Sequence, residues 1–438
     1  MALFYNPKKS AASNVQTRQT EIIDLDYQGL GVAKINGKTW FIENSLPSES
    51  VQFVVREEKR QYGLGRCNKI LRASEQRVQP RCADYTLCGG CQSQHISINL
   101  QRQAKQQALF HRLQRLQSQP IKLMPMLIGE PWAYRRRVKF SLKFNPRTKQ
   151  LDMGFRQKNS NEIVNIQQCD VLEPRLSQCI SPLRALLKQI KQPKLLGHIE
   201  LVLAQNGVAM LLRHSKNMEN FDRGLWLDFA KQHQLHLFLQ DDQRIQKIAG
   251  EMPYYQLNDL NLQFDIRDFI QVNAELNQKM VATALDWLAI QADETVLDLF
   301  CGMGNFSLPL AQVAKQVIGV EGVLEMVHKA EKNAQQNGLE NVQFYQADLT
   351  QPFTQQAWAK THFDKILLDP PRAGADFALQ AVCQLQAKQI LYISCNPATL
   401  VRDAEIILRS GYVAVQVAMI DMFPQTGHLE SMTLFEKQ

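Results

Sequence analysis

The sequence predicts a multidomain α/β protein: a small β-barrel first, a mixed α/β domain in the middle, and a doubly wound α/β domain last. Three observations predict this. The chain has 438 residues, a length typical of about three domains. Residues 20–72 alternate short strand-like runs with turn signals, which is typical of small β-barrels. From about residue 264, helical and strand-like segments alternate, as in a mostly parallel sheet covered by helices.

We expect four segments along the chain. Residues 1–18 are polar and are expected to be flexible. Residues 19–75 form the barrel, in which Asn36-Gly37 is typical of a hairpin turn. Residues 76–262 form the central domain, with an amphipathic helix from Leu100 to Leu116. Residues 263–438 form the C-terminal α/β domain, which holds the candidate reactive residues described below.

Charge is distributed unevenly along the chain. The totals are 50 Lys plus Arg against 42 Asp plus Glu, a formal charge of +8. Residues 81–160 hold 15 basic and 3 acidic side chains, net +12, whereas residues 261–438 hold 12 and 20, net −8. A basic front and an acidic back indicate a region that binds a polyanion and a region with another task. Solvated charged faces are the alternative reading.

The densest basic cluster is RRRVK, residues 135–139. On a strand, alternation would place Arg135, Arg137 and Lys139 on one face. Such a row predicts a track for nucleic-acid phosphates. A charged, solvated edge strand is the alternative.

A glycine turn predicts the nucleotide-like site. In TVLDLFCGMGNFS, Asp298 ends a buried strand, and Gly302 and Gly304 open the turn into a helix. Such turns let backbone amides approach a ligand. Glu321 ends the next strand, where it could accept both hydroxyls of a ribose. An ordinary tight turn is the alternative.

Two further segments carry candidate reactive groups. FDKILLDPPRAG brings Asp369 to the carboxyl end of the sheet, and QILYIS delivers Cys395 to the same edge. A cysteine at that edge is a candidate nucleophile. Glu430, beside apolar residues, is a candidate base with a raised pKa. Cys301 and Cys383 are interpreted as buried packing residues.

A separate cysteine cluster predicts a metal site. Cys82, Cys88 and Cys91 have the spacing C-x5-C-x2-C, and Cys169 is the leading fourth ligand. Gly89 and Gly90 between the last two would let amides turn toward the sulfurs of an iron–sulfur cluster. Four thiolates suit zinc equally well, so both metals remain open.

Together these segments resemble the RNA uracil-C5 methyltransferases that use S-adenosylmethionine, which have a Rossmann-like class I methyltransferase domain. The matching strings are FIQVN (269–273), DLFCGMGNF (298–306), DPPRAG (369–374), SCNPATL (394–400) and GHLESM (427–432). The resemblance implies Cys395 as nucleophile, Glu430 as base and Phe269 as the aromatic near the target base. It implies that the cofactor is surrounded by Gln271, Phe300, Asn305, Glu321, Asp348 and Asp369.

The implied chemistry explains these residue types. Uracil C5 is a poor nucleophile, so a thiolate first adds at C6 and creates an enolate that takes the methyl group. A base then removes the C5 proton, and the thiolate is expelled. Because the target atoms are otherwise stacked, the nucleotide must be flipped out or unpaired.

The N-terminal part of the chain indicates which group within this family it resembles. The barrel resembles a TRAM domain, an RNA-binding module of oligonucleotide-barrel (OB) shape. Relatives that have both the barrel and the cysteine set act on uracil 1939 of 23S ribosomal RNA and carry a 4Fe-4S cluster. Methylation of another rRNA or tRNA uridine is the alternative, as is an inactive RNA-binding assembly factor. No apolar run approaches the length of a membrane span, so we expect a cytoplasmic protein. We also expect it to be a monomer.

Overall fold

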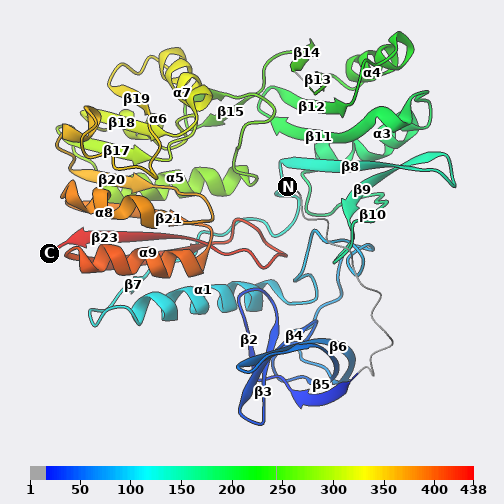
Figure 1. Cartoon of the computed structure of the whole chain (residues 1–438), viewed down its shortest axis with the longest axis horizontal. Coiled ribbons are helices and arrows are strands. Elements are labelled where there is room, and N and C mark those ends of the chain that lie inside the picture. Colours follow the sequence, from blue (N-terminus) through cyan, green and yellow to red (C-terminus); the bar gives the residue numbers. More distant parts are fainter. Residues whose placement is uncertain (1–15, 243) are drawn as a thin grey trace.

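A computed structural model describes residues 16–242 and 244–438. Figure 1 shows a small β-domain, a central α/β domain and a larger α/β domain that ends at the C-terminus. Helix α1 (Ile98–Gln114) runs along the large domain, on the side that faces the small β-domain. Residues 1–15 of the predicted flexible segment lie outside the described residues, and strand β1 begins at Thr17, inside that predicted segment.

The small β-domain is a six-stranded sheet in the described residues. The sheet order is β1-β5-β6-β4-β3-β2. Its strands are β1 (Thr17–Glu21), β2 (Asp24–Leu25), β3 (Gly31–Ile35), β4 (Lys38–Glu43), β5 (Ser50–Glu58) and β6 (Tyr62–Arg72). Trp40 and Phe53 fill its core. A Cβ on Gly63 would lie 2.5 Å from the Trp40 ring, so only glycine fits there.

The central domain is a seven-stranded sheet in the order β10-β9-β8-β11-β12-β13-β14. Helices α3 and α4 pack on it (Figure 1). The elements are β8 (Arg137–Asn145), β9 (Gln150–Arg156), β10 (Ile163–Val164), α2 (Pro174–Ser177), α3 (Ile180–Leu187), a 3-10 turn (Pro193–Leu195), β11 (Leu196–Ala204), β12 (Gly207–His214), α4 (Asn220–Gln232), β13 (Leu235–Gln240) and β14 (Ile245–Ala249).

The catalytic domain is an eight-stranded sheet in the order β19-β18-β17-β20-β21-β23-β22-β7. Strands β17 to β21 are parallel, and β23 is antiparallel between β21 and β22. Its elements are α5 (Ala274–Leu288), β17 (Thr295–Leu299), α6 (Ser307–Ala311), β18 (Gln316–Glu321), α7 (Leu324–Gln336), β19 (Val342–Gln346), a 3-10 turn (Trp358–Lys360), β20 (Lys365–Leu368), α8 (Asp376–Gln384), β21 (Gln389–Ser394), α9 (Pro397–Arg409), β22 (Tyr412–Ile420) and β23 (Glu430–Lys437).

Two segments of the predicted central range 76–262 pack on the catalytic domain instead. The predicted helix is α1, and with β7 (Lys122–Leu123) it lies against β22 and α9. The hairpin of β15 (Tyr254–Leu257) and β16 (Leu260–Gln263) places its apolar side chains in the catalytic core. These contacts join residues far apart in sequence, so strand pattern alone did not predict them.

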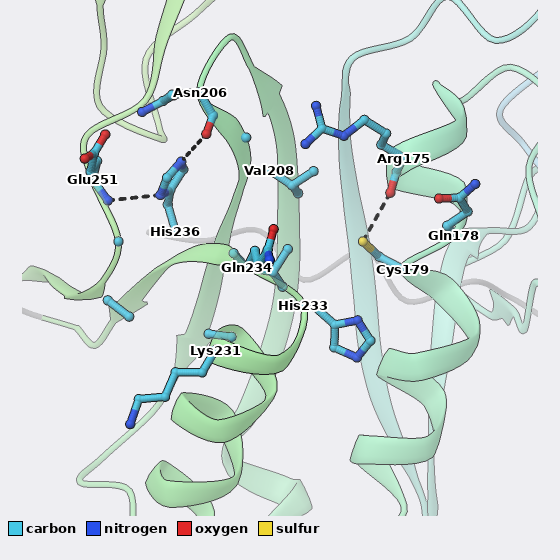
Figure 2. Close-up of a pocket in the computed structure, with 15 residues that line it drawn as sticks. Arg175, Gln178, Cys179, Asn206, Val208, Lys231, His233, Gln234, His236 and Glu251 are labelled. Carbon is cyan, nitrogen blue, oxygen red and sulfur yellow. Dashed lines mark hydrogen bonds between the residues drawn. The ribbon is translucent and has the colours of Figure 1, made fainter.

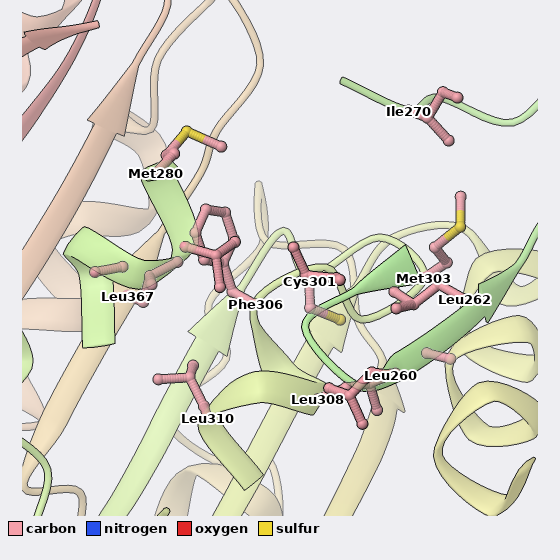
Figure 3. Close-up of a cluster of buried hydrophobic side chains, with 14 of the residues drawn as sticks. Leu260, Leu262, Ile270, Met280, Cys301, Met303, Phe306, Leu308, Leu310 and Leu367 are labelled. Carbon is pink, nitrogen blue, oxygen red and sulfur yellow. The ribbon is translucent and has the colours of Figure 1, made fainter. Parts of the chain in front are cut away.

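The catalytic core lies behind the glycine turn. Figure 3 shows Cys301 and Met303 on the side of Leu260, Leu262 and Leu308, and Phe306 on the side of Met280, Leu310 and Leu367. Cys301 is 4% exposed and Cys383 is 3% exposed, which confirms the packing interpretation of both. No helix of the described residues is long and apolar enough to cross a membrane.

Candidate active site

The carboxyl ends of the parallel strands bring the predicted reactive groups to one edge. Asp298 lies in β17, Glu321 ends β18, Asp369 follows β20 and Cys395 follows β21. Glu430 is the first residue of β23, which pairs with β21. Ligands of open α/β sheets bind at this edge.

Cys395 and Glu430 lie next to each other across β21 and β23. Ser394 is opposite Ser431 in the antiparallel register; Cys395 directly follows Ser394, and Glu430 directly precedes Ser431. The two groups are close enough for the charge of Glu430 to act on the Cys395 thiol. Cys395 immediately precedes Asn396, whose side chain accepts a hydrogen bond from the Ala398 N–H at 3.0 Å and caps α9. The thiol is thus fixed between a strand end and a helix start.

Both reactive groups are held in their neutral forms in the free protein. Burial, with the charges of Glu430 and Asp369, raises the pKa of Cys395 to about 11, and Arg372 opposes the shift. Burial and Asp369 raise the pKa of Glu430 to about 8. Near neutral pH these values favour a thiol at Cys395 and a carboxylic acid at Glu430.

Two more carboxyl groups crowd this edge. Burial raises the pKa values of Asp298 and Asp369 to about 7. Ser307 donates a hydrogen bond to Asp298 Oδ2, but Asp298 Oδ1 is buried without a partner. An unpaired buried carboxylate oxygen beside further acids fits a cationic ligand, such as the sulfonium and ammonium groups of S-adenosylmethionine.

The glycine turn is built around Glu321. Phe300, Gly302 and Gly304 all have positive φ, at 63°, 56° and 98°. Glu321 accepts hydrogen bonds from the Gly302 N–H at 3.1 Å and the Val323 N–H at 3.0 Å. These bonds fix the carboxylate at the turn and leave further lone pairs for a ribose.

The remaining predicted cofactor residues differ in their exposure and in their hydrogen bonds. Asp348 is exposed after β19, and hydrogen bonds from Thr350 lower its pKa. Gln271 is partly exposed. Asn305 is already engaged: its Oδ1 accepts from the Tyr255 hydroxyl at 3.0 Å and from Asn277 at 2.9 Å. Its amide also donates to Asn277, so it fixes the turn to α5.

The basic row on β8 is only partly available to RNA. Lys139 is exposed, Arg135 is partly exposed, and Phe269 is 72% exposed. Arg137, however, pairs with Glu200 at 2.6 Å and donates to the backbone carbonyls of Asp268 and Ile266. Three of the five N–H donors of Arg137 are therefore used within the chain, where they join the central and catalytic domains, and we expect Arg137 to contribute less to RNA binding than Lys139.

The four predicted cysteine ligands approach one another from two segments. Burial, together with the charges of Cys82 and Cys88, raises the pKa of Cys91 to about 11 and that of Cys169 to about 12. The Gly90 N–H lies 3.4 Å from Cys88 Sγ. Among the described residues, no three His, Cys, Asp or Glu side chains are arranged to hold one metal ion. The predicted metal site is therefore not shown by this geometry.

A cavity of about 650 Å³ lies elsewhere, in the central domain. Figure 2 shows Arg175, Cys179 and His236 on its walls. His236 Nε2 lies 3.0 Å from Asn206 O, and its Nδ1 accepts from the Glu251 N–H at 2.9 Å. Both ring nitrogens are thus satisfied, and none of the predicted site residues lines this cavity.

A buried group of ion pairs around Asp421 was not predictable from the sequence pattern. Asp421, whose side chain is 0% exposed, pairs with Arg102 at 2.8 Å and Lys105 at 3.1 Å. Both cations come from α1, more than 300 residues away along the chain. An isolated Asp in an apolar segment gave no signal of these partners.

The fold and site define an RNA methyltransferase with a separate RNA-binding β-module. Residues 97–438 match the sequence model of the tRNA (Uracil-5-)-methyltransferase family, and residues 12–67 match the TRAM domain. The chain belongs to this family.

Individual relatives are similar over the whole chain. It is 62% identical to the 23S rRNA (uracil(1939)-C(5))-methyltransferase RlmD of Haemophilus parainfluenzae, covering 100% of both chains. It is 48% identical to the protein of the same name from Edwardsiella ictaluri, over 100% of this chain and 99% of that one.

One solved structure has a similar fold. The Pyrococcus abyssi tRNA (uracil-54, C5)-methyltransferase in complex with S-adenosyl-L-homocysteine matches with a TM-score of 0.73 and 21% identity, covering 95% of this chain and 100% of that one. This likeness confirms the predicted methyltransferase fold.

Proposed function

We propose that this protein methylates C5 of a uridine in 23S ribosomal RNA, the uridine numbered 1939 in the names of its relatives, with S-adenosylmethionine as methyl donor. The observation that carries the proposal is the placement of Cys395 and Glu430 next to each other across β21 and β23. The full-length relatives support the choice of RNA.

Within this proposal the chain's own groups have defined tasks. The Cys395 thiol first gives up its proton to solvent, because the thiolate is the nucleophile, although burial raises the pKa of this thiol. The thiolate sulfur then adds to C6 of the uracil, and the electron pair of the C5–C6 double bond moves into an enolate. The cofactor supplies an electrophilic methyl group to C5. Glu430, as its carboxylate, then accepts the C5 proton, and the bond between Cys395 and C6 breaks. Phe269, Arg135 and Lys139 are proposed RNA contacts, and the proposed cofactor residues are Gln271, Phe300, Asn305, Glu321, Asp348 and Asp369.

The test is methyl transfer from labelled S-adenosylmethionine into a 23S rRNA fragment. Cys395→Ala should abolish transfer, whereas Cys179→Ala, a partly buried cysteine of the central domain, should retain it. Glu430→Gln should accumulate a covalent protein–RNA adduct, because the C5 proton is not removed. A fragment with cytidine in place of the target uridine should accept no methyl group. Transfer by Cys395→Ala would refute the covalent route, and transfer to another uridine would refute the proposed position.

We also propose that Cys82, Cys88, Cys91 and Cys169 hold a 4Fe-4S cluster. Four thiols without disulfides and a glycine amide directed at a sulfur support this donor set. A cluster would join the cysteine loop to the Cys169 segment and has no part in methyl transfer. Iron and sulfide analysis after anaerobic purification should find both, with loss in Cys169→Ala and retention in Cys179→Ala. Zinc in place of iron would overturn the proposal.

We further propose that the protein acts as a cytoplasmic monomer.

A further inference from the structure

Arg136 is the buried member of the basic row. It lies directly before β8, with its side chain on the face opposite Arg137, and is 6% exposed. Its guanidinium lies over the Tyr255 ring, 4.9 Å from the centroid. Its Nε donates to the Gln271 carbonyl at 2.8 Å, but its Nη2 is buried without a hydrogen-bond partner.

No acid in the described part of the chain pairs with this cation. Among the described residues, no Asp or Glu forms an ion pair with Arg136, in contrast to Arg137 with Glu200. Burial lowers the pKa of Arg136 to about 10, so the group is still charged at neutral pH. A buried, unpaired charge is strongly unfavourable unless a ligand pairs with it.

A second unpartnered donor lies at the same junction. Asn273 is 2% exposed, and its Nδ2 has no partner, although its Oδ1 caps α5 by accepting from the Leu276 N–H at 3.2 Å. The Arg136 N–H donates to Val272 O at 2.8 Å, so β8 meets the FIQVN segment here. Two buried donors without an acceptor indicate that an anionic group binds nearby.

The junction is connected to the cofactor turn. Tyr255, beneath the guanidinium, donates its hydroxyl to Asn305, which follows Gly304 in that turn. The strand ends on the other side of the turn carry the acids Asp298 and Asp369. A ligand lying between Arg136 and these strand ends would meet acids at one end and the guanidinium at the other.

We propose that Arg136 binds the carboxylate of the amino-acid part of S-adenosylmethionine. The inference rests on the proposed function. The cofactor is a zwitterion whose sulfonium and ammonium groups suit the acidic strand ends, whereas its carboxylate suits a buried guanidinium. An RNA phosphate is disfavoured because Arg136 is buried, whereas its neighbour Lys139 is exposed.

The test is calorimetric binding to the full-length protein of two probes: S-adenosylhomocysteine, and S-adenosyl-3-thiopropylamine, which lacks only the carboxylate. Wild type should prefer the first. Arg136→Met should lower the affinity for S-adenosylhomocysteine about 10- to 100-fold. It should lower the affinity for the amine by less than about twofold. Arg136→Lys, which keeps a charge, should fall between. Arg213→Met, on β12 with a half-exposed side chain, is the matched control and should bind both probes like wild type.

Several outcomes would overturn the inference. Equal loss of both probes in Arg136→Met would make Arg136 a purely structural residue. Unchanged probe affinities with weaker RNA binding would assign the anion to a phosphate. If Arg136→Met does not fold, as judged by its thermal transition, Arg136→Lys carries the same test. Failure of wild type to bind S-adenosylhomocysteine would instead refute the proposed function.

Discussion

Gln101 in α1 holds Gln425 through two hydrogen bonds: its Nε2 donates to Gln425 Oε1, and its Oε1 accepts from the Gln425 backbone N–H, both at 3.1 Å. Gln425 has a positive φ of 67° and lies five residues before Glu430. Its carbonyl also accepts from the N–H groups of Gln92 and Ser93, in the cysteine loop. The loop that leads to Glu430 is therefore fixed by two segments far away in sequence.

Gln101→Leu should lower kcat about 10- to 100-fold, because the loop before Glu430 loses its fixed position. It should also lower the free energy of unfolding by about 1–3 kcal/mol, because buried groups lose their hydrogen bonds. Steady-state methyl transfer and urea unfolding measure the two effects. Gln114→Leu is the matched control: Gln114 bonds the Ile121 N–H at the other end of α1. Gln114→Leu should lower stability but leave kcat unchanged. An equal fall in kcat for both variants would contradict the positioning role of Gln101.

Asp421→Asn should lower the free energy of unfolding by about 3–5 kcal/mol, because it leaves the Lys105 ammonium buried without a counter-ion. The side chain of Lys105 is 2% exposed and that of Asp421 is 0% exposed. Chemical unfolding measures the change. Glu162→Gln breaks the exposed pair with Lys143 and should change stability by less than about 1 kcal/mol. A change for Asp421→Asn no larger than for Glu162→Gln would show that the ion pairs around Asp421 do not stabilise the fold.

Glu430→Gln should stabilise the protein more as the pH rises. The pKa of Glu430 is raised from 4.5 to about 8 in the fold. Below the unfolded value the acid is protonated in both states; between the two values the unfolded chain releases its proton first, so wild-type stability falls as pH rises. The stability difference between variant and wild type should grow from about pH 5 to about pH 8 and then level off.

Urea unfolding across this pH range measures the difference. Glu405→Gln, which removes a half-exposed acid paired with Arg409 on α9, should show no such growth. A difference for Glu430→Gln that is constant with pH would mean that the carboxyl is already ionised in the folded protein.

Local sequence patterns predicted those features of the fold that depend on short stretches of chain. The run before Asp298 and the turn at Gly302 are set by neighbouring residues, so the β17–turn–α6 unit was predictable. Placing Cys395 beside Glu430 needed the insertion of β23 between β21 and β22. That arrangement is a long-range pairing, and only the family resemblance indicated it.

The basic row shows where pattern reasoning stops. Alternation correctly separated Arg136 from Arg137, because successive side chains of a strand point to opposite faces. Which donors remain free depends on Glu200 in β11 and on the carbonyls of residues 266 and 268. No local pattern in residues 135–139 indicates those partners.

Arg137→Met should therefore change protein stability, whereas Lys139→Met should change RNA binding. Arg137→Met should lower the free energy of unfolding by up to about 3 kcal/mol, because Glu200 loses its partner, and the folded variant should keep the salt dependence of RNA binding. Lys139→Met should keep stability but reduce the slope of log affinity against log salt by about one, as expected for one lost phosphate contact. Urea unfolding and filter binding at several salt concentrations measure both. A reduced slope in folded Arg137→Met would restore Arg137 to the phosphate track, because its guanidinium would then have to leave Glu200 when RNA binds.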